Sequence, residues 1–236
     1  MPSEVRDSAS QRGLWGRTVR ALMGLKEDIA RFVVLIRYGK QARQIPRSPF
    51  VLEQEVAKAV LRVVGPSLVV ADLHPKQQHL FLFGGEHRDR ETSFRWIPAA
   101  DPYGQATLVA RVDFDIPTSG FHAELTCSVP EEVSNWKFHQ VFNLWYRSLS
   151  KDAHLFVTFT DATGQRWFFT QGGILRGGQW CLLRVPLSQF RSPEEFRKDN
   201  AQHRERVTQA TFQIVNESGA PDCRGYLELH QAFLSH

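Results

Sequence analysis

The sequence is short of cysteine, methionine and tyrosine, and it has no long hydrophobic run. Its 236 residues include 3 Cys, 2 Met and 4 Tyr, against 17 Phe and 6 Trp. Three cysteines without a C-x-x-C spacing argue against a disulfide framework and a zinc site, and indicate free thiols in a reducing compartment. The longest apolar stretch, 29–38, is interrupted by Arg31 and Arg37. It is far shorter than the roughly 20 residues that a membrane-spanning helix needs.

The start of the chain is also poor in apolar residues. Residues 1–13 are polar and charged, where a secretory signal would need an apolar run. We therefore expect a cytoplasmic protein, including one that lies peripherally at a membrane or a membrane complex.

Positive charge is concentrated at one end of the chain. Lys and Arg number 29 and Asp and Glu 25, which gives a net charge of +4. Residues 1–50 hold 10 basic and 4 acidic residues (10 − 4 = +6), and the remainder carries 19 − 21 = −2. A nucleic-acid-binding body would need its own basic face to neutralise phosphates, so we expect no nucleic-acid partner.

Catalytic and metal-binding motifs are missing as well. The Gly-Gly pairs lack the Lys-Ser/Thr of a phosphate loop, and no G-x-S-x-G elbow is present. The nine histidines show no i,i+4 pair beside an acid, as a helical metal site would need. Asp113 and Asp115 lie on one predicted strand, whereas glycosidase carboxyls face each other across a bond. We expect no enzymatic activity, no metal and no cofactor.

The first 50 residues contain a basic amphipathic pattern. Apolar residues at steps of three and four predict a helix over 14–43, followed by a proline-punctuated linker. Such a helix could bind a partner protein, lie on an anionic membrane surface, or fold back onto its own domain. The acidic residues Glu27 and Asp28 favour a protein partner over lipid. The predicted partner-binding residues are Leu22, Leu25, Ile29, Phe32 and Ile36.

After a second, short helix over 52–64, the pattern changes to alternating runs separated by turn residues. This pattern is typical of an antiparallel sandwich or barrel. A further short helix is predicted over 192–206. We therefore expect a helical arm and linker over 1–50, a short helix within 51–66 and a β-sandwich over 67–236. The expected strands are 68–73, 80–83, 93–97, 106–115, 120–129, 137–148, 154–160, 166–170, 180–185, 209–215 and 225–234.

Three of these strands carry one aliphatic face and one face that mixes polar groups with aromatic rings. They are 137–148, 154–160 and 209–215. Alternate residues of a strand point to opposite sides, so each set can share a face. An exposed ring with neighbouring Arg and Asn donors suits the apolar side and the hydroxyls of a sugar. The alternative is that helices or a partner cover this face and Trp145 serves in packing. The predicted ligand-binding residues are Asn143, Trp145, Arg147, His154, Phe156, Thr158 and Gln213.

Five segments of the sandwich follow one another in a familiar order. They are SNWKFHQVFNLWYRS, HLFVTFTDATGQRWFF, GGQWCLLRVPLSQF, VTQATFQIV and GYLELHQAFL. They resemble the jelly roll of the galactose-binding-like superfamily, and within it carbohydrate-binding modules and the complex I intermediate-associated protein family. Those groups have an Asp-x-x-Gly turn (here Asp161 and Gly164), a Pro-containing strand end (here 185–190) and a last strand that starts at Gly (here Gly225).

Two features depart from these groups. The last strand of many such modules carries acidic residues that help to hold calcium, but the matching positions here are His230 and Gln231. Calcium prefers several carboxylate oxygens, so no structural calcium is expected. The nearest sequence to the Gly-Gly-x-Ser stretch of the complex I family is 84–87, which reads GGEH.

The sequence therefore predicts a mainly β chain, a jelly-roll sandwich with an N-terminal helical extension. Two non-catalytic functions remain open. The sandwich could be the docking platform of an assembly subunit that the basic helix anchors to a larger complex, including a membrane-associated one. Alternatively, the mixed face could bind a glycan. The absence of an export signal favours the first function, and the mixed face favours the second.

Overall fold

The structure is a computed structural model that describes residues 50–64, 68–76, 81–85, 92–116, 122–150, 153–171, 178–192, 202–216 and 223–236. Residues 46–236 form one compact unit. The predicted helix over 14–43 lies outside the described residues, and so do its partner-binding positions, Leu22 to Ile36. Of the helix predicted over 192–206, residues 202–206 form loop and turn instead, and 193–201 lie outside the described residues.

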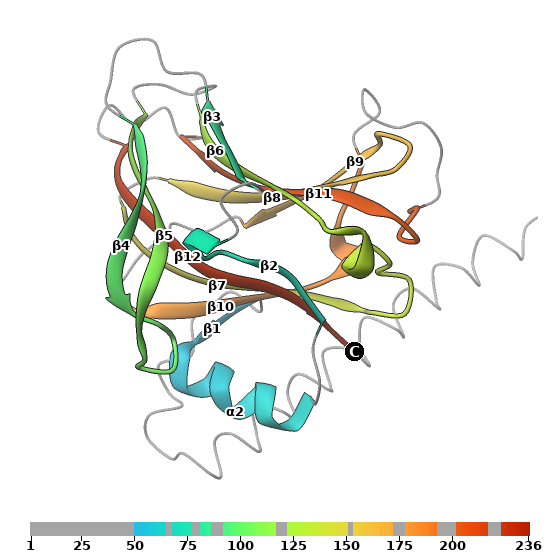
Figure 1. Cartoon of the computed structure of the whole chain (residues 1–236), viewed down its shortest axis with the longest axis horizontal. Coiled ribbons are helices and arrows are strands. Elements are labelled where there is room, and N and C mark those ends of the chain that lie inside the picture. Colours follow the sequence, from blue (N-terminus) through green and yellow to red (C-terminus); the bar gives the residue numbers. More distant parts are fainter. Residues whose placement is uncertain are drawn as a thin grey trace, which may run out of the picture. The chain divides into compact units, whose positions relative to one another are not determined.

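Two antiparallel sheets make up the unit (Figure 1). The seven-stranded sheet has β2 (Leu68–Asp72) beside β12 and otherwise the order β1 (Val51–Glu53), β10 (Trp180–Pro186), β7 (Val141–Ser150), β12 (Cys223–Ser235), β5 (Ala106–Ile116) and β4 (Ser93–Ala100). The five-stranded sheet has the order β3 (Phe81–Gly85), β6 (His122–Ser128), β11 (Val207–Val215), β8 (His154–Asp161) and β9 (Arg166–Gln171). One helix, α2 (Gln54–Val64), and two short 3₁₀ helices, η3 (Glu131–Val133) and η4 (Leu187–Gln189), complete the described elements.

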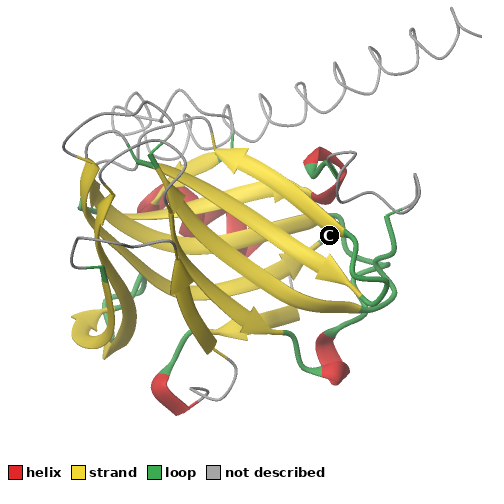
Figure 2. Cartoon of the chain, turned by 90° about the horizontal axis from the view of Figure 1, so that it is seen from above, coloured by secondary structure: helices red, strands yellow, loops and turns green. Residues whose placement is uncertain are grey.

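The predicted sandwich is confirmed, with all eleven expected strands present. Strand β1 was missed because its three residues continue directly into α2, and the sequence reads them as the first turn of that helix. Figure 2 shows the strands of the two layers from above.

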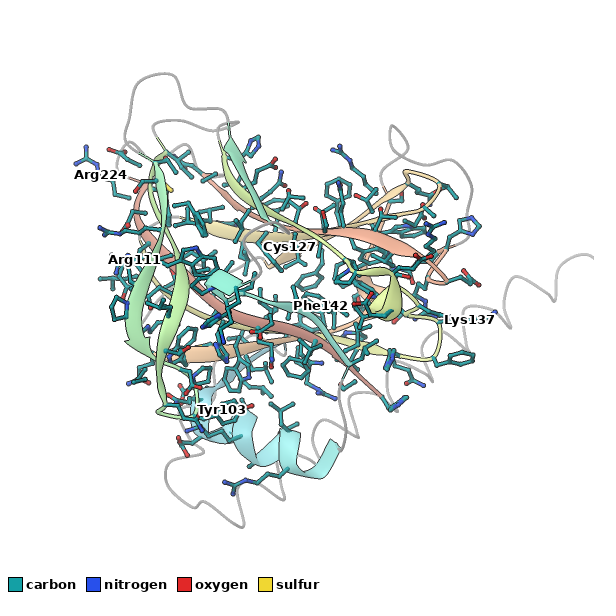
Figure 3. The ribbon with its side chains drawn as sticks, in the orientation of Figure 1. Tyr103, Arg111, Cys127, Lys137, Phe142 and Arg224 are labelled. Atoms are coloured by element: carbon teal, nitrogen blue, oxygen red, sulfur yellow. The ribbon has the colours of Figure 1, made fainter. Side chains whose placement is uncertain are left out.

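Alternation of side chains places the core between the sheets. Phe142 of β7 and Cys127 of β6 point into this space from opposite layers (Figure 3). Phe159 of β8 lies with its ring centroid 5.3 Å from that of Trp136 and 5.0 Å from that of Phe190. Aromatic pairs at such separations add to the stabilisation that burial itself provides. The aliphatic face predicted for β7, β8 and β11 is therefore the inner face of the sandwich.

A second apolar cluster lies on the outer face of the seven-stranded sheet, beneath α2. The helix contributes Ala57 and Leu61, which pack against Leu182 of β10 and Phe233 of β12. An amphipathic helix is stabilised chiefly by burying its apolar face in this way. Helix α2 therefore covers one end of this outer face (Figure 1).

Two turns share the sequence Asp-x-x-Gly-Gln, at 101–105 and 161–165. In the second turn, Asp161 Oδ1 accepts hydrogen bonds from the backbone N–H groups of Thr163 (2.9 Å) and Gln165 (3.1 Å). Gly104 and Gly164 have φ angles of 87° and 81°, a region where glycine has no steric penalty. The hairpin turn predicted at 161–164 is confirmed, and the chain uses the same turn once more between β4 and β5.

Candidate functional site

The seven predicted ligand-binding residues do not form one surface. Asn143, Trp145 and Arg147 lie on β7 of the seven-stranded sheet, whereas the other four lie on β8 and β11 of the five-stranded sheet. All seven point away from the core, so the two groups lie on opposite sides of the sandwich. The prediction of a single mixed face is wrong in this respect. Strands β8 and β11 do pair, and this pairing places Phe156 opposite Gln213.

Asn143 is fully buried and its polar atoms are used within the protein. Its Nδ2 donates to the carbonyl oxygen of Phe233 (3.3 Å) and to Ser235 Oγ (3.1 Å). Its Oδ1 accepts from Nη1 of Arg184 at 3.0 Å. Asn143 therefore joins β7, β10 and β12 and has no exposed surface for a ligand.

Trp145 is also fully buried, in the cluster beneath α2. Its ring meets Tyr103 edge-on, with 6.0 Å between the ring centroids. A ring without exposed area cannot stack on a sugar, so the packing alternative is the correct one for Trp145.

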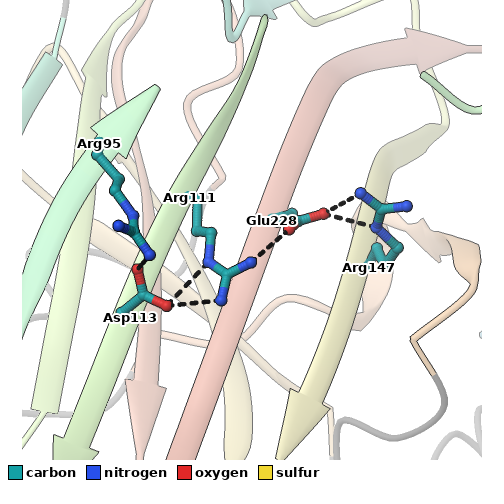
Figure 4. Close-up of polar contacts among 5 residues, drawn as sticks. All are labelled: Arg95, Arg111, Asp113, Arg147 and Glu228. Atoms are coloured by element: carbon teal, nitrogen blue, oxygen red, sulfur yellow. Dashed lines mark hydrogen bonds and ion pairs between the residues drawn. The ribbon is translucent and has the colours of Figure 1, made fainter. Parts of the chain in front are cut away.

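Arg147 belongs to a row of alternating charges that crosses the outer face of the seven-stranded sheet beyond α2 (Figure 4). We call this row the charged strip, and its members are Arg95 on β4, Arg111 and Asp113 on β5, Glu228 on β12 and Arg147 on β7.

The ion pairs of the charged strip run without a break from β4 to β7. Arg95 Nη2 lies 2.9 Å from Asp113 Oδ2, and Arg111 Nε donates to Asp113 Oδ1 at 2.8 Å. Glu228 accepts from both sides, from Arg111 Nη1 at 3.1 Å and from Arg147 Nε at 2.5 Å. Its side chain is only 2% exposed. The strip is therefore a surface of fixed charges that lies on the opposite side of the molecule from the remaining predicted residues.

The outer face of the five-stranded sheet holds the four remaining predicted residues and further residues that the prediction missed. The four are His154, Phe156, Thr158 and Gln213. Gln213 Nε2 donates to Glu124 Oε2 at 2.8 Å, and His122 Nε2 lies 3.5 Å from the same oxygen. The hydroxyls of Thr126 and Thr211 are 2.9 Å apart. A polar row of amide, carboxylate and hydroxyl groups thus crosses β11 and β6.

Aromatic rings lie beside this polar row on β8 and β9. Phe156 and Phe168 are outward-facing and half-buried, and Phe168 is the register partner of Thr158. The register partner of Phe156 on β11 is Gln213, so the Phe156 ring borders the Gln213 amide directly. Thr158 is 5% exposed, and its Oγ1 has no hydrogen-bond partner among the described residues. We call this surface the polar-aromatic face, and it consists of His122, Glu124, Thr126, His154, Phe156, Thr158, Phe168, Thr211 and Gln213.

The sequence contains signals for the residues of this face that the prediction missed. His122, Glu124 and Thr126 alternate with the apolar residues of a strand that was predicted correctly. Prediction failed to assign them because the neighbours of β6 in the sheet are β3 and β11, which are distant in sequence. Phe168 lies in the predicted strand 166–170, where it alternates with the inward-facing Trp167 and Phe169.

Glu124, on the polar-aromatic face, has a perturbed acidity. Its pKa is lowered from 4.5, chiefly by the hydrogen bond with His122 and further by that with Gln213, while burial opposes the shift. Because the folded-state pKa is below the unfolded value, the ionised carboxylate stabilises the fold above pH 4.5. This contribution is lost as the pH falls from 4.5 through the lower folded-state pKa.

We expect the variant Glu124→Gln to lose this acid dependence. The free energy of unfolding of the wild type should fall more steeply below pH 4.5 than that of the variant. Urea denaturation at a series of acidic pH values measures both curves. Parallel curves would contradict the assignment.

Metal-ligand chemistry is not evident in the described part of the chain, where no group of three or more His, Cys, Asp and Glu side chains is arranged to hold an ion. His230 faces Trp180, with 6.2 Å between the ring centroids. None of the described helices is both long and apolar enough to span a bilayer.

The fold is an antiparallel jelly-roll sandwich, like that of carbohydrate-binding modules. No protein-family profile and no curated protein matches the sequence. Among solved structures, the chain is similar to the family 11 carbohydrate-binding module of the cellulosomal cellulase Lic26A-Cel5E of Clostridium thermocellum. The identity is 12%, the match covers 72% of this chain and 94% of the module, and the TM-score is 0.52.

A second similar structure is the family 11 module from Clostridium thermocellum in complex with a β-1,3-1,4-mixed-linked tetrasaccharide. The identity is 13%, the coverage is 71% of this chain and 94% of the module, and the TM-score is 0.52. Similarity at this level of identity shows the fold alone. The resemblance to the complex I intermediate-associated protein family stays a prediction.

Proposed function

We propose that this protein is a non-catalytic glycan-binding protein and that the polar-aromatic face of the five-stranded sheet is its binding surface. The observation that supports this proposal best is the arrangement on that sheet, where two outward-facing rings border a row of amide, carboxylate and hydroxyl groups. Helix α2 covers the other sheet, and no described helix lies over this one (Figure 1).

The chemistry of the face suits an uncharged sugar chain. The apolar side of a pyranose can stack on Phe156 and Phe168, since rings bind by burying apolar area. Gln213 and Glu124 already share a hydrogen bond, and the second N–H of the amide and the remaining lone pairs of the carboxylate can bind sugar hydroxyls. The exposed Arg166 on β9 offsets the Glu124 carboxylate, so the formal charge near the face is close to zero. A neutral glycan therefore fits better than an acidic one.

The order of groups across the sheet also predicts how the ligand lies. The rings are on β8 and β9 and the polar row is on β11 and β6. A chain of sugars that crosses the strands would contact rings at one end and hydrogen-bonding groups at the other. The similar module in complex with a mixed-linked tetrasaccharide supports this choice of ligand class, and it supplies the first probe.

The test is a calorimetric titration of the full chain with the β-1,3-1,4-mixed-linked tetrasaccharide and a panel of other neutral oligosaccharides. For whichever sugar binds, Phe156→Ala should raise Kd at least tenfold, which is about 1.4 kcal/mol. Gln213→Ala should also weaken binding, because it removes a donor and releases Glu124.

The matched control is Phe138→Ala, which removes a phenylalanine that is 73% exposed and lies in the loop before β7. It should leave Kd unchanged. If no sugar in the panel binds, or if Phe138→Ala weakens binding as much as Phe156→Ala, the proposal is wrong.

A further inference from the structure

The charged strip of the opposite sheet presents positive charge to solvent, although its charges nearly balance. Three arginines face two acids, which leaves one positive charge. Glu228 lies deeper than all three arginines: its side chain is 2% exposed, against 22% for Arg111 and Arg147 and 60% for Arg95, while Asp113 is 26% exposed. The most exposed charged group of the strip is therefore the Arg95 guanidinium, and the acid that lies between Arg111 and Arg147 is hidden from an approaching molecule.

Aromatic rings hold two of these arginines in place. The guanidinium carbon of Arg111 lies 4.0 Å from the centre of the Tyr226 ring, and that of Arg147 lies 4.9 Å from the Trp180 ring. Each is also bonded to Glu228, so its side chain loses little freedom when a partner binds. Arg, Tyr and Trp are the residue types that dominate the energetics of protein interfaces.

An exposed apolar side chain lies next to the strip. Leu149 of β7 is 57% exposed and is the register partner of Tyr226 on β12, which in turn pairs with Asp113 on β5. Oriented cations, the partly exposed Tyr226 ring and an apolar side chain thus share one face, beyond the end that α2 covers.

We propose that the charged strip is a docking surface for a partner protein that presents an acidic segment together with an apolar side chain. The acidic residues would face Arg95 and Arg147, and the apolar side chain would contact Leu149. Charge excludes the chain's own N-terminal segment as the occupant, because residues 1–50 carry +6. A neutral glycan is better matched by the other face, so sugar and partner would bind on opposite sides.

The test is a titration of the ¹⁵N-labelled full chain with poly-L-glutamate at low ionic strength, followed by NMR. We expect the largest shifts at the Nε resonances of Arg95 and Arg147 and at the backbone of β4, β5 and β7. The shifts should largely disappear at 0.5 M salt, where the Debye length is only about 4 Å.

Two variants examine the strip itself. Arg95→Ala should weaken poly-L-glutamate binding by roughly three- to tenfold, and it should fold normally because this side chain is mostly exposed. Arg147→Lys keeps the charge and should weaken binding less than Arg147→Ala. The matched control, Arg206→Ala, removes an arginine that is 65% exposed and lies outside the strip, and it should leave these shifts unchanged.

Three outcomes would overturn the proposal. The first is that poly-L-glutamate shifts only resonances of residues 1–49. The second is that Arg206→Ala weakens binding at the strip as much as Arg95→Ala. The third is that polygalacturonate binds the strip at least as tightly, which would indicate an acidic glycan in place of a protein. The neutral-oligosaccharide titration reports on the other sheet, so either proposal can fail without the other.

Discussion

Replacing Phe159 by alanine should lower the free energy of unfolding by about 3–5 kcal/mol. Phe159 is 1% exposed and lies at the centre of the aromatic core. Its ring stacks on Trp167 with 6.3 Å between centroids and contacts Trp136 and Phe190 more closely. Since all three neighbours are large and held by other contacts, they cannot collapse into the space, and the variant leaves a cavity. Urea denaturation followed by tryptophan fluorescence measures the loss.

Phe156→Ala, three residues earlier on the same strand, is the matched control for this prediction. Phe156 points to the other side of β8 and is only half-buried, so its replacement should cost about 1 kcal/mol. The two variants remove the same atoms, and only the direction of the side chain differs. Equal losses of stability would show that the register of β8 is not the one described here.

Glu228→Ala should destabilise the fold by about 2–4 kcal/mol, because it removes the carboxylate that two arginines share. The side chains of Arg111 and Arg147 are each 22% exposed, so water can reach them only in part. Without Glu228 they remain close to each other with like charge. The loss should therefore be smaller at high salt, which screens this repulsion.

Asp115→Ala is the control for Glu228→Ala. Asp115 also forms an ion pair on this face, 3.1 Å from Arg224 Nε, but the Arg224 side chain is 60% exposed. Exposed ion pairs contribute about 0–1 kcal/mol, so this variant should be close to wild type in stability. Chemical denaturation of both variants at low and high salt is the measurement. A loss for Asp115→Ala as large as for Glu228→Ala would contradict the importance that we assign to burial.

Local alternation was enough to predict which side of three strands faces the core. Phe142 and Leu144, or Leu155 and Val157, are separated by one residue and must point the same way in any strand. These inward positions are confirmed on β7, β8 and β11 alike. The number and spacing of such runs predict an antiparallel sandwich or barrel, and the resemblance to the galactose-binding-like superfamily narrows this prediction to a jelly roll.

Alternation could not predict which sheet each strand joins. Strands β7 and β8 are consecutive, and consecutive strands pair or neighbour about two-thirds of the time. Here the chain crosses from one sheet to the other between Ser150 and His154, so β7 and β8 are in different layers. This single crossover separates Arg147 from Phe156 and divides the predicted site in two.

The burial of Trp145 beneath α2 could not be predicted for a similar reason. The helix was predicted over 52–64, close to the observed bounds Gln54–Val64. Nothing in one sequence states which sheet a helix packs against, because any apolar surface of the right size can receive it. The cytoplasmic localisation and the docking of the N-terminal helix stay predictions.

The place of β12 has a consequence for how the molecule folds. It follows every other described strand along the chain, and yet it lies in the interior of its sheet, paired with β7, β5 and β2. During translation, the earlier strands of that layer must wait without their central neighbour until β12 has left the ribosome. Such distant pairings make folding slow and leave strand edges open meanwhile. The nascent polypeptide is therefore expected to need chaperone protection until β12 has emerged.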